Sequence, residues 1–488
     1  MQKLYGHRYL LILFILNFIE MGIELSAAKL LSPYFGNSQY VWVSILSVII
    51  IGGALGNYIG GKVKQENYPS HIVLMFSLTT IWIAFIYKFG DWASTICTLL
   101  HIIPGTLISS ILMFLPPCLF LSTMTPIILT LYCDTNQSER QGISHSVIAI
   151  GGLLGTVITG FIILPFLGTD KTFLVFIIIL VLSAIFLLYK YKKIKKLVEI
   201  VTLLVCSILL CIVPISQYES DVVADITTNY SRIKIIKSQI KYEGEDKDIL
   251  LYQSAGASSS ATFIDEDLKY ELVFDYLKTY DEINNKVNAN SVAMIGGAAY
   301  MYPKYYISHY TDKTMDVIEI DEQSPIIAKK YFYLDDLLKE YGTDRLNLIT
   351  DDGRLYFQNS SKLYDIIFND AFSGGIPVST LCTDEAVKII KNKLTNTGCY
   401  ALNILGSLQG PKGRFLRSEI KVLQNNFNYV TIVPTNKNDL IEYSNYIVIA
   451  SDMDYNIDGV NVEFEENEIF LTDNNCPVDM LVSTHYME

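Results

Sequence analysis

Carboxylates and glycines in the second half of the chain follow short apolar runs in a pattern that could bind a nucleoside. Gly296 and Gly297 come directly after the run SVAMI, where they would let the backbone approach a ligand at the start of a helix. Glu319 falls 23 residues after Gly296, close to the spacing of an acidic residue that holds ribose hydroxyls. The two motifs together predict a nucleoside site, and a helix cap or a solvated side chain is the alternative for Glu319.

Two further carboxylates follow later apolar runs. Asp352 and Gly353 come after LNLIT, where the adenine edge would lie in a nucleoside-binding fold, although an acidic helix N-cap explains the same residues. Asp370 ends the run YDIIFND and precedes the glycine-rich segment 373–377. A carboxylate at the end of a buried strand is well placed to face a substrate, and a simple turn is the competing interpretation.

A doubly wound α/β sheet is predicted to position these residues. Its buried strands are the runs SVAMIGG, MDVIEID, LNLIT, YDIIFND, CYALNIL, YVTIV and YIVIA. Amphipathic stretches separate most of them, and ligands of such sheets bind outside the carboxyl ends of the strands. Three earlier runs of β type, 232–240, 248–254 and 260–264, are separated by glycines and charged turns and predict a small β subdomain.

The first 214 residues are predicted to form a membrane domain. The chain has a mean hydropathy of +0.32 and 51% hydrophobic residues, which is too apolar for an ordinary soluble enzyme. Apolar runs of about 20 residues, the length of a spanning helix, occur near 9–31, 41–61, 71–89, 105–132, 144–165, 171–189 and 197–214. The shorter stretch 92–103 predicts an interfacial or re-entrant segment. We therefore expect about seven helices and a multi-pass protein of the cell membrane.

The predicted membrane domain contains charges and glycines of its own. Glu20 and Glu24 lie four residues apart on one face of the first span, with Lys29 a little beyond them. Charges at that depth are costly, which indicates either a functional role or a Glu24–Lys29 pair that holds helices together. The glycine-rich segments 52–56 and 151–155 lie inside apolar spans and predict close helix packing.

Charge and cysteine content limit the classes of partner. Of the 37 basic and 50 acidic residues, 13 and 8 lie before residue 215, so the first part carries +5 and the remainder −18. An acidic second half argues against nucleic acid, which needs a basic surface. It suits a cationic substrate, although surplus carboxylates also keep a domain soluble. The eight cysteines have no CxxC or regular spacing, so we expect neither a disulfide framework nor a metal site.

The order of these motifs resembles the spermidine synthase family, the polyamine aminopropyltransferases, and in particular a bacterial branch fused to a membrane domain. The resemblance covers nearly the whole chain. In the first half it rests on Glu24-Leu25, Leu31-Ser32-Pro33-Tyr34-Phe35-Gly36 and Tyr40-Val41-Trp42. In the second half it rests on Gly296-Gly297, Tyr300, Pro303, Val317-Ile318-Glu319-Ile320-Asp321, Asp352-Gly353, Tyr364-Asp365, Asp370, Ile376-Pro377 and Leu381-Cys382-Thr383.

The resemblance implies an enzyme in which a β subdomain closes over a Rossmann-like domain of the class I S-adenosylmethionine-binding type. We expect a transmembrane domain at 1–214, the β subdomain at 225–285 and the Rossmann-like domain at 286–488. The implied co-substrate is decarboxylated S-adenosylmethionine, the implied partners are a small amine and the lipid bilayer, and a homodimer is compatible with it. No further cofactor is implied.

Site roles follow from the same resemblance. Glu319 would hold the ribose, Asp352 the adenine, and Asp370 would act on the attacking amine. Tyr270 and Ser373 would contact the amine, with Ser373 at a position where the family normally has a second aspartate.

Departures from the family pattern leave the acceptor amine open. Ala298 and Ala299 stand where the family has a third glycine followed by an aspartate. The adenosyl site is therefore better preserved than the amine site. Two alternatives stay open: an S-adenosylmethionine-dependent methyltransferase on the same fold, and a non-catalytic membrane protein that senses nucleosides or polyamines and resembles a transporter.

Overall fold

The structure is a computed structural model that describes residues 2–133, 137–188, 221–255, 257–436, 442–465 and 468–483. The chain divides into two compact units. The first, which we call the helical unit, comprises Met1–Ser220 together with the short segment Ile226–Arg232. The second, the α/β unit, comprises Asp221–Asp225 and Ile233–Glu488.

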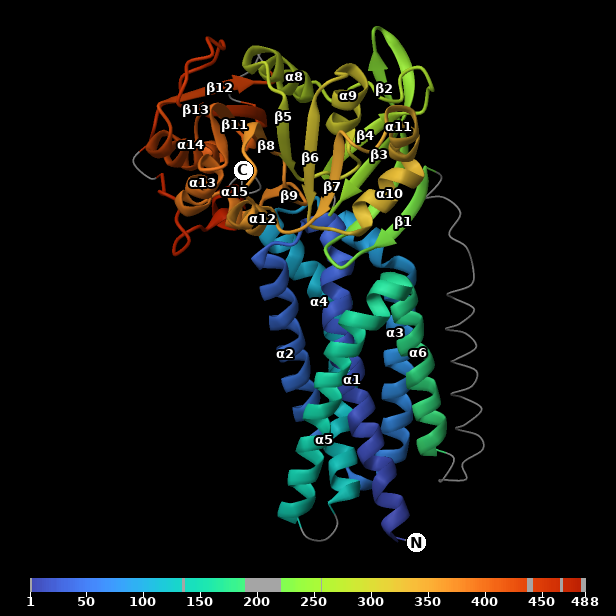
Figure 1. The fold of residues 1–488 in the computed structure, drawn as a ribbon. Coiled ribbons are helices and arrows are strands. Elements are labelled where there is room, and N and C mark those ends of the chain that lie inside the picture. Colours follow the sequence, from blue (N-terminus) through green and yellow to red (C-terminus); the bar gives the residue numbers. More distant parts are fainter. Residues whose placement is uncertain are drawn as a thin grey trace. The chain divides into compact units, whose positions relative to one another are not determined.

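Long apolar helices make up the described part of the helical unit (Figure 1). They are α1 (Gln2–Phe35), α2 (Gln39–Gly61), α3 (Tyr68–Cys97), α4 (Ile102–Tyr132), α5 (Gln137–Ile158) and α6 (Leu164–Leu188), with the π-helical turn η2 (Thr159–Ile163) between the last two. By length and composition they give five stretches that could cross a membrane, the last being Ser138–Leu187. Gly168, with a φ of +78°, breaks the helical geometry within this stretch.

These helices match six of the seven predicted spans, and the seventh, 197–214, lies outside the described residues. The stretch 92–103 does not form a separate re-entrant segment, and its predicted position at the membrane interface stays a prediction. Helix α3 continues through Trp92 to Cys97, and a turn of a few residues then leads into α4.

Glycines bring the helices into close contact, as predicted from the two glycine-rich segments. A Cβ atom on Gly56 of α2 would lie 2.5 Å from the carbonyl oxygen of Leu119 on α4. A Cβ atom on Gly155 of α5 would lie 2.8 Å from the Cα atom of Phe18 on α1. Backbones can approach this closely only where a side chain is missing, so both segments serve packing.

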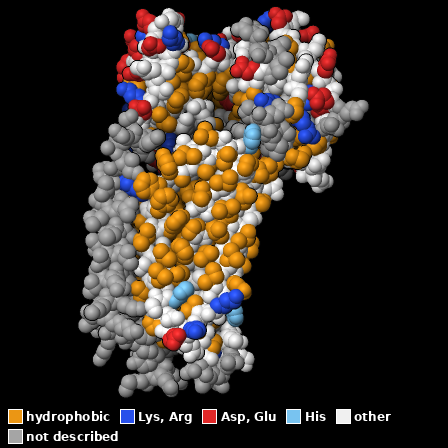
Figure 2. Space-filling model, turned by 180° about the vertical axis from the view of Figure 1, so that it is seen from behind, with side chains coloured by type: hydrophobic (Ala, Val, Ile, Leu, Met, Phe, Trp, Pro, Cys, Tyr) orange, Lys and Arg blue, Asp and Glu red, His pale blue; other side chains and the backbone are white. Residues whose placement is uncertain are grey.

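The outer surface of the helical unit is apolar. Figure 2 shows hydrophobic side chains covering most of the visible face of these helices. Strongly exposed examples are Ile50, Leu112, Leu153, Phe161, Phe166 and Leu182. A large contiguous apolar surface is costly in water, and together with the helix lengths it fits a lipid environment.

Inside the helical unit, the intramembrane carboxylates have specific neighbours. The hydroxyl of Ser122 on α4 donates to Glu20 Oε1 at 3.0 Å. Lys29 donates to the carbonyl oxygen of Asn229 at 3.0 Å, at the end of α1 far from the N-terminus. The expected Glu24–Lys29 pair therefore stays a prediction, whereas Glu20 is held between α1 and α4.

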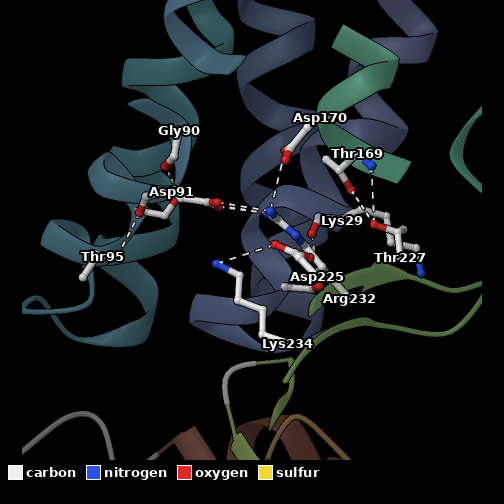
Figure 3. Close-up of polar contacts among 12 residues, drawn as sticks. Lys29, Gly90, Asp91, Thr95, Thr169, Asp170, Asp225, Thr227, Arg232 and Lys234 are labelled. Carbon is white, nitrogen blue, oxygen red and sulfur yellow. Dashed lines mark hydrogen bonds and ion pairs between the residues drawn. The ribbon is translucent and has the colours of Figure 1, made fainter. Parts of the chain in front are cut away.

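A charged cluster holds the segment Ile226–Arg232 against the ends of three helices (Figure 3). The Arg232 guanidinium, only 2% exposed, donates to both oxygens of Asp91 on α3 at 2.9 and 3.1 Å. Asp170 on α6 lies 3.6 Å from the same group. The hydroxyl groups of Thr169 and Thr227 lie 3.3 Å apart beside it.

Two main sheets, the smaller and the larger, make up most of the α/β unit, and a third sheet of only two strands accompanies them. The smaller has the order β1-β2-β3-β4, with β1 at Val222–Thr227, β2 at Arg232–Tyr242, β3 at Glu245–Ser254 and β4 at Ala257–Phe263. It is the predicted β subdomain, and its first strand begins slightly before the expected boundary at 225. All its strand pairs between β2 and β4 are antiparallel.

The larger sheet has seven strands in the order β12-β13-β11-β8-β5-β6-β7. Its strands are β5 (Ser291–Ile295), β6 (Thr314–Glu319), β7 (Leu346–Thr350), β8 (Tyr364–Asn369), β11 (Leu394–Gly406), β12 (Tyr429–Pro434) and β13 (Ser444–Ser451). The five strands from β11 to β7 run parallel, and β13 and β12 join antiparallel. The predicted Rossmann-like fold is confirmed, because every predicted strand is present.

Helices cover both faces of the larger sheet and form two cores. The first core contains side chains from α8 (Tyr276–Val287), α9 (Met301–His309), α10 (Gln323–Tyr331) and α11 (Leu334–Tyr341), together with strands β3 and β4. The second contains side chains from α12 (Gly353–Asn359), α13 (Asp384–Lys391), α14 (Arg414–Asn426) and α15 (Val478–Ser483). This double layer fixes the strands whose ends carry the candidate site.

Candidate active site

The predicted site residues lie at one edge of the larger sheet. Strands β8, β5, β6 and β7 are adjacent and parallel, so their carboxyl ends share that edge. Gly296 follows β5, Glu319 ends β6, and Asp370 follows β8. The order of neighbouring strands places the glycines between the two carboxylates.

The first glycine is required by the close approach of two loops. Gly296 has a φ of +89°, and a Cβ atom there would lie 2.8 Å from the carbonyl oxygen of Asp370. Its N–H donates to the carbonyl oxygen of Ile318 on the other side, at 2.9 Å. The residue thus ties the ends of β8 and β6 together, which only a residue without a side chain can do here.

The Glu319 carboxylate organises the glycine loop from the next strand. Its Oε2 accepts from the N–H groups of Gly297 at 2.7 Å and Ala298 at 3.0 Å, and its Oε1 accepts from the N–H of Asp321 at 3.1 Å. Burial raises the pKa of Glu319 above its ordinary value, and these three N–H groups counteract part of that effect. The carboxylate is therefore fixed at the sheet edge with unused lone pairs on Oε1 for a ligand hydroxyl.

Asp352 caps a helix. Its Oδ1 accepts from the N–H of Leu355 at 2.9 Å, in the N-cap position of α12. The alternative of an acidic N-cap is thus realised, and a second carboxylate oxygen remains for another partner. Gly353 is required beside it, because a Cβ atom would lie 2.6 Å from Ile295 of β5.

Asp370 is held by two side chains from different elements. The hydroxyl of Tyr276 at the start of α8 donates to Oδ2 at 2.8 Å, and the amide of Asn403 on β11 donates to Oδ1 at 2.8 Å. Burial raises the pKa of Asp370 above its ordinary value, while these two hydrogen bonds act in the opposite direction. The carboxylate is oriented, and its raised pKa suits it to accept a proton.

The glycine-rich segment after Asp370 forms a tight hairpin. Strand β9 (Phe372–Ser373) pairs antiparallel with β10 (Ile376–Pro377), and Gly374 and Gly375 between them have φ values of 63° and 79°. Two consecutive positive φ values are typical of a two-residue hairpin turn that favours glycine. Ser373 therefore lies three residues from Asp370 on the short strand of this hairpin.

The predicted contact of Tyr270 with the amine stays a prediction. Its ring packs edge-on against Tyr341 of α11, with centroids 6.1 Å apart, and Lys269 lies over it. The tyrosine that reaches Asp370 is Tyr276.

Three polar residues of this site were missed by the sequence analysis. Asn445 on β13 donates through its side chain to Asn403 Oδ1 at 2.8 Å, and Asn403 in turn donates to Asp370. The available signal was an asparagine inside the apolar run CYALNIL, because a buried amide in a strand needs a hydrogen-bonding partner. For Tyr276 no sequence signal distinguished it from the neighbouring tyrosines.

A small-molecule ligand fits this edge better than a metal does. Within the described ranges no group of three or more His, Cys, Asp or Glu side chains is arranged to hold a metal ion. Glu319, Asp352 and Asp370 are instead separated along the sheet edge, each on its own strand end. Three separated carboxylates can contact different parts of an extended ligand.

Comparison with known proteins shows a similarity over residues 281–451. This segment matches the model of the spermine/spermidine synthase domain. The polyamine aminopropyltransferase of Methanocaldococcus jannaschii is 27% identical over 128 residues, which are 26% of this chain and 43% of that protein. The polyamine aminopropyltransferase of Vibrio vulnificus is 28% identical over 115 residues, which are 23% of this chain and 36% of that protein. The aligned part of the chain thus spans less than half the length of these curated relatives.

Similar solved structures include a probable spermidine synthase from Corynebacterium glutamicum, with a TM-score of 0.39 and 20% sequence identity; the match covers 47% of this chain and 80% of that one. The spermidine synthase of Thermotoga maritima has a TM-score of 0.37 and 15% sequence identity; the match covers 48% of this chain and 75% of that one. The family match contains β5 to β13, including Glu319, Asp352, Asp370 and Asn403. Residues 281–451 of this chain are thus similar to the spermine/spermidine synthase domain.

Proposed function

We propose that the protein is a membrane-bound aminopropyltransferase. It transfers an aminopropyl group from decarboxylated S-adenosylmethionine to a small amine such as putrescine. The observation that carries the proposal is the fixed, half-buried carboxylate of Asp370 beside the Gly296 loop, with Glu319 on the far side of that loop at the end of β6. A nucleoside lying across the glycine loop would place its reactive chain toward Asp370.

The donor is held through its nucleoside part. Glu319 would accept from a ribose hydroxyl through Oε1, and Asp352 would accept from the adenine through the oxygen that does not cap α12. The loop from Gly296 to Ala298 brings backbone close to the nucleoside. These contacts are the same before and during the reaction, so they supply binding and orientation.

Asp370 serves the acceptor amine. A free alkylamine has a pKa near 10.4, so generating the neutral base at pH 7 costs about 4–5 kcal/mol. The nitrogen lone pair attacks the carbon attached to the sulfonium, the carbon–sulfur bond breaks, and its electrons return to sulfur to give methylthioadenosine. Asp370 stabilises the ammonium ion on binding and accepts the proton that the nitrogen loses. Ser373, beside it, supplies a hydroxyl contact to the amine.

The helical unit would anchor the enzyme in the cell membrane. Its five stretches of spanning length and its apolar exterior support this placement. The α/β unit needs no lipid for its own core, because both of its cores are closed by its own helices. Its binding partners are then the two small substrates, with a homodimer as a further expectation.

Product analysis on the purified full chain tests the proposal. The protein is incubated with decarboxylated S-adenosylmethionine and a panel of amines, and the expected products are methylthioadenosine and an amine heavier by one aminopropyl group. Asp370→Asn should lower turnover at least about a hundredfold. The matched control is Asp365→Asn at the other end of β8, where the carboxylate accepts from backbone N–H groups of Asn290 and Ser291. It should stay within a few-fold of the wild type.

The alternatives give different outcomes in the same preparation. A methyltransferase would form S-adenosylhomocysteine from S-adenosylmethionine and leave the decarboxylated compound unused. A transporter-like protein would form neither product, and vesicles containing it would show amine flux. Equal turnover of Asp370→Asn and the wild type would show that Asp370 is not the base.

A further inference from the structure

A chain of side-chain hydrogen bonds runs through the larger sheet to Asp370. Asn445 on β13 donates to Asn403 Oδ1 at 2.8 Å, and Asn403 Nδ2 donates to Asp370 Oδ1 at 2.8 Å. The three residues come from β13, β11 and the end of β8, which are adjacent strands. Because Asn445 occupies the oxygen of the Asn403 amide, the NH2 group of Asn403 must point at the carboxylate.

The other oxygen of Asp370 is fixed from outside the sheet. Tyr276 donates to Oδ2 at 2.8 Å from the first turn of α8. Its ring is held in turn by Phe274, stacked with centroids 6.2 Å apart, and by Tyr280, edge-on at 5.9 Å. Rotation of the tyrosine is therefore restricted by packing as well as by the hydrogen bond.

We propose that Asn403, Asn445 and Tyr276 are positioning residues that orient the Asp370 carboxylate toward the acceptor amine. This inference rests on the aminopropyltransferase proposed above. With one protein donor on each oxygen, the carboxylate cannot rotate, and only the remaining lone pair of each oxygen is available to the amine. The direction from which the amine nitrogen approaches is thereby set before the substrate arrives.

The surroundings of Asp370 make these hydrogen bonds measurable. Within the described residues, the titratable groups that face it are the hydroxyls of Tyr276 and Tyr280 on α8, while β11 contributes an amide. Burial raises the pKa of Asp370, and the two hydrogen bonds counteract that effect because they favour the charged form. Loss of either donor should raise the pKa further.

The first test is the pH dependence of kcat/KM for the full chain. Tyr276→Phe and Asn403→Leu should each lower kcat/KM about 10–100-fold and move its acid limb to higher pH. Asn445→Leu leaves the Asn403 amide free to turn and should give a smaller shift in the same direction. A loss of activity without any movement of the acid limb would mean that these residues serve folding alone, and would overturn the proposal.

The matched control is another asparagine that donates to an aspartate. Asn347 on β7 donates to Asp316 Oδ1 at 2.7 Å. Asp316 lies on β6, three residues before Glu319. Because Asn347 is exposed and Asn403 is buried, Asn347→Leu should lower the melting temperature less than Asn403→Leu does, and the acid limb should stay in place. A shift of the acid limb in this variant as well would show that the effect is general destabilisation.

A second test does not depend on turnover and separates this inference from the proposed function. Melting temperatures of Asn403→Leu and the wild type are compared from pH 5 to pH 9, with and without Asp370→Asn. The difference between them should grow as the pH rises and should lose its pH dependence once Asp370 is replaced. If the wild type is inactive but this result is obtained, the proposed function and the orientation toward an amine are refuted, while the fixing of the Asp370 carboxylate by Asn403 stands. A pH dependence that persists without Asp370 would overturn the positioning role.

Discussion

The ion pair between Arg232 and Asp91 should hold the segment Ile226–Arg232 onto the helices. Removing one partner of a buried ion pair costs about 3–5 kcal/mol. Asp91 is 31% exposed, and Asp170 remains 3.6 Å from the guanidinium, so part of this cost is relieved. We therefore expect Asp91→Asn to weaken the attachment by about 2–3 kcal/mol, a discounted fraction of that range.

Hydrogen exchange of the full chain measures this attachment directly. The N–H groups of Thr228 and Ser231 are bonded within the segment, to the Ser231 carbonyl at 2.8 Å and to the Thr228 hydroxyl at 3.0 Å. A tenfold change in an opening equilibrium corresponds to about 1.4 kcal/mol. Exchange in this segment should therefore be about 30–150-fold faster in Asp91→Asn, while the strands of the larger sheet keep their protection.

Asp170→Asn is the control for this prediction. The Asp170 side chain is 51% exposed and its contact is longer, and exposed pairs contribute about 0–1 kcal/mol. Exchange should rise by no more than about fivefold in this variant. Equal effects of the two substitutions, or unchanged exchange in Asp91→Asn, would refute the view that the guanidinium is anchored chiefly by Asp91.

Three further predictions concern the α/β unit. Glu319→Gln should weaken binding of methylthioadenosine by about 1–3 kcal/mol, because an amide cannot accept from two backbone N–H groups and a hydroxyl equally well; calorimetry measures this. Glu419 is fully buried, and neither of its oxygens has a hydrogen-bond partner within the described residues. Burial raises the pKa of Glu419, so the protein loses stability as the pH rises through that pKa. Glu419→Met should therefore raise the melting temperature at pH 8 and have less effect at pH 5. A chain beginning near Asp221 should be soluble without detergent, and insolubility across several start points would contradict the domain boundary.

Periodicity was sufficient to predict the α/β sheet. Each predicted run became a strand because buried strands of parallel sheets are continuous apolar segments, and turn residues mark their ends. The carboxylates at those ends could be placed on one edge for the same reason. Gly296 was singled out from sequence, and its positive φ and contact with the Asp370 loop give the physical reason for it.

Contacts between distant residues could not be predicted in the same way. Tyr276 and Tyr270 lie six residues apart in one aromatic segment, and only the course of the chain into α8 decides which of them reaches Asp370. Asn403 and Asn445 meet because β11 and β13 are antiparallel neighbours, a pairing that the sequence pattern alone does not specify. Side-chain networks of this kind depend on strand order rather than on local sequence.

The ends of the helices lead to the last prediction. Gln2 and Leu188 lie at one end of the helical unit, because six antiparallel helices separate them, and the segment Ile226–Arg232 is held at the other end. The seventh predicted span, 197–214, falls between Leu188 and Ile226 in the sequence and lies outside the described residues. No described stretch after Arg232 is long and apolar enough to return.

Basic residues gather at the first of these two ends. Lys3 and Arg8 precede the first span, Lys62 and Lys64 follow α2, and Arg140 lies at the start of α5. Because loops rich in lysine and arginine stay in the cytoplasm, this end is predicted to be cytoplasmic.

The charge distribution therefore predicts that the C-terminus lies outside the cytoplasm, where the proposed donor, decarboxylated S-adenosylmethionine, is not made. The distribution of basic residues places the C-terminus outside the cytoplasm, whereas the supply of donor favours a cytoplasmic position. Reporter fusions at Tyr191 and at the C-terminus decide between these two positions. We expect them on opposite sides of the membrane, with Tyr191 in the cytoplasm. If both reporters are cytoplasmic, the seven-span arrangement is wrong and the donor supply is explained. If they are on opposite sides as expected, the enzyme must receive its donor outside the cytoplasm, and an assay with donor added only to that side of sealed vesicles should then give product.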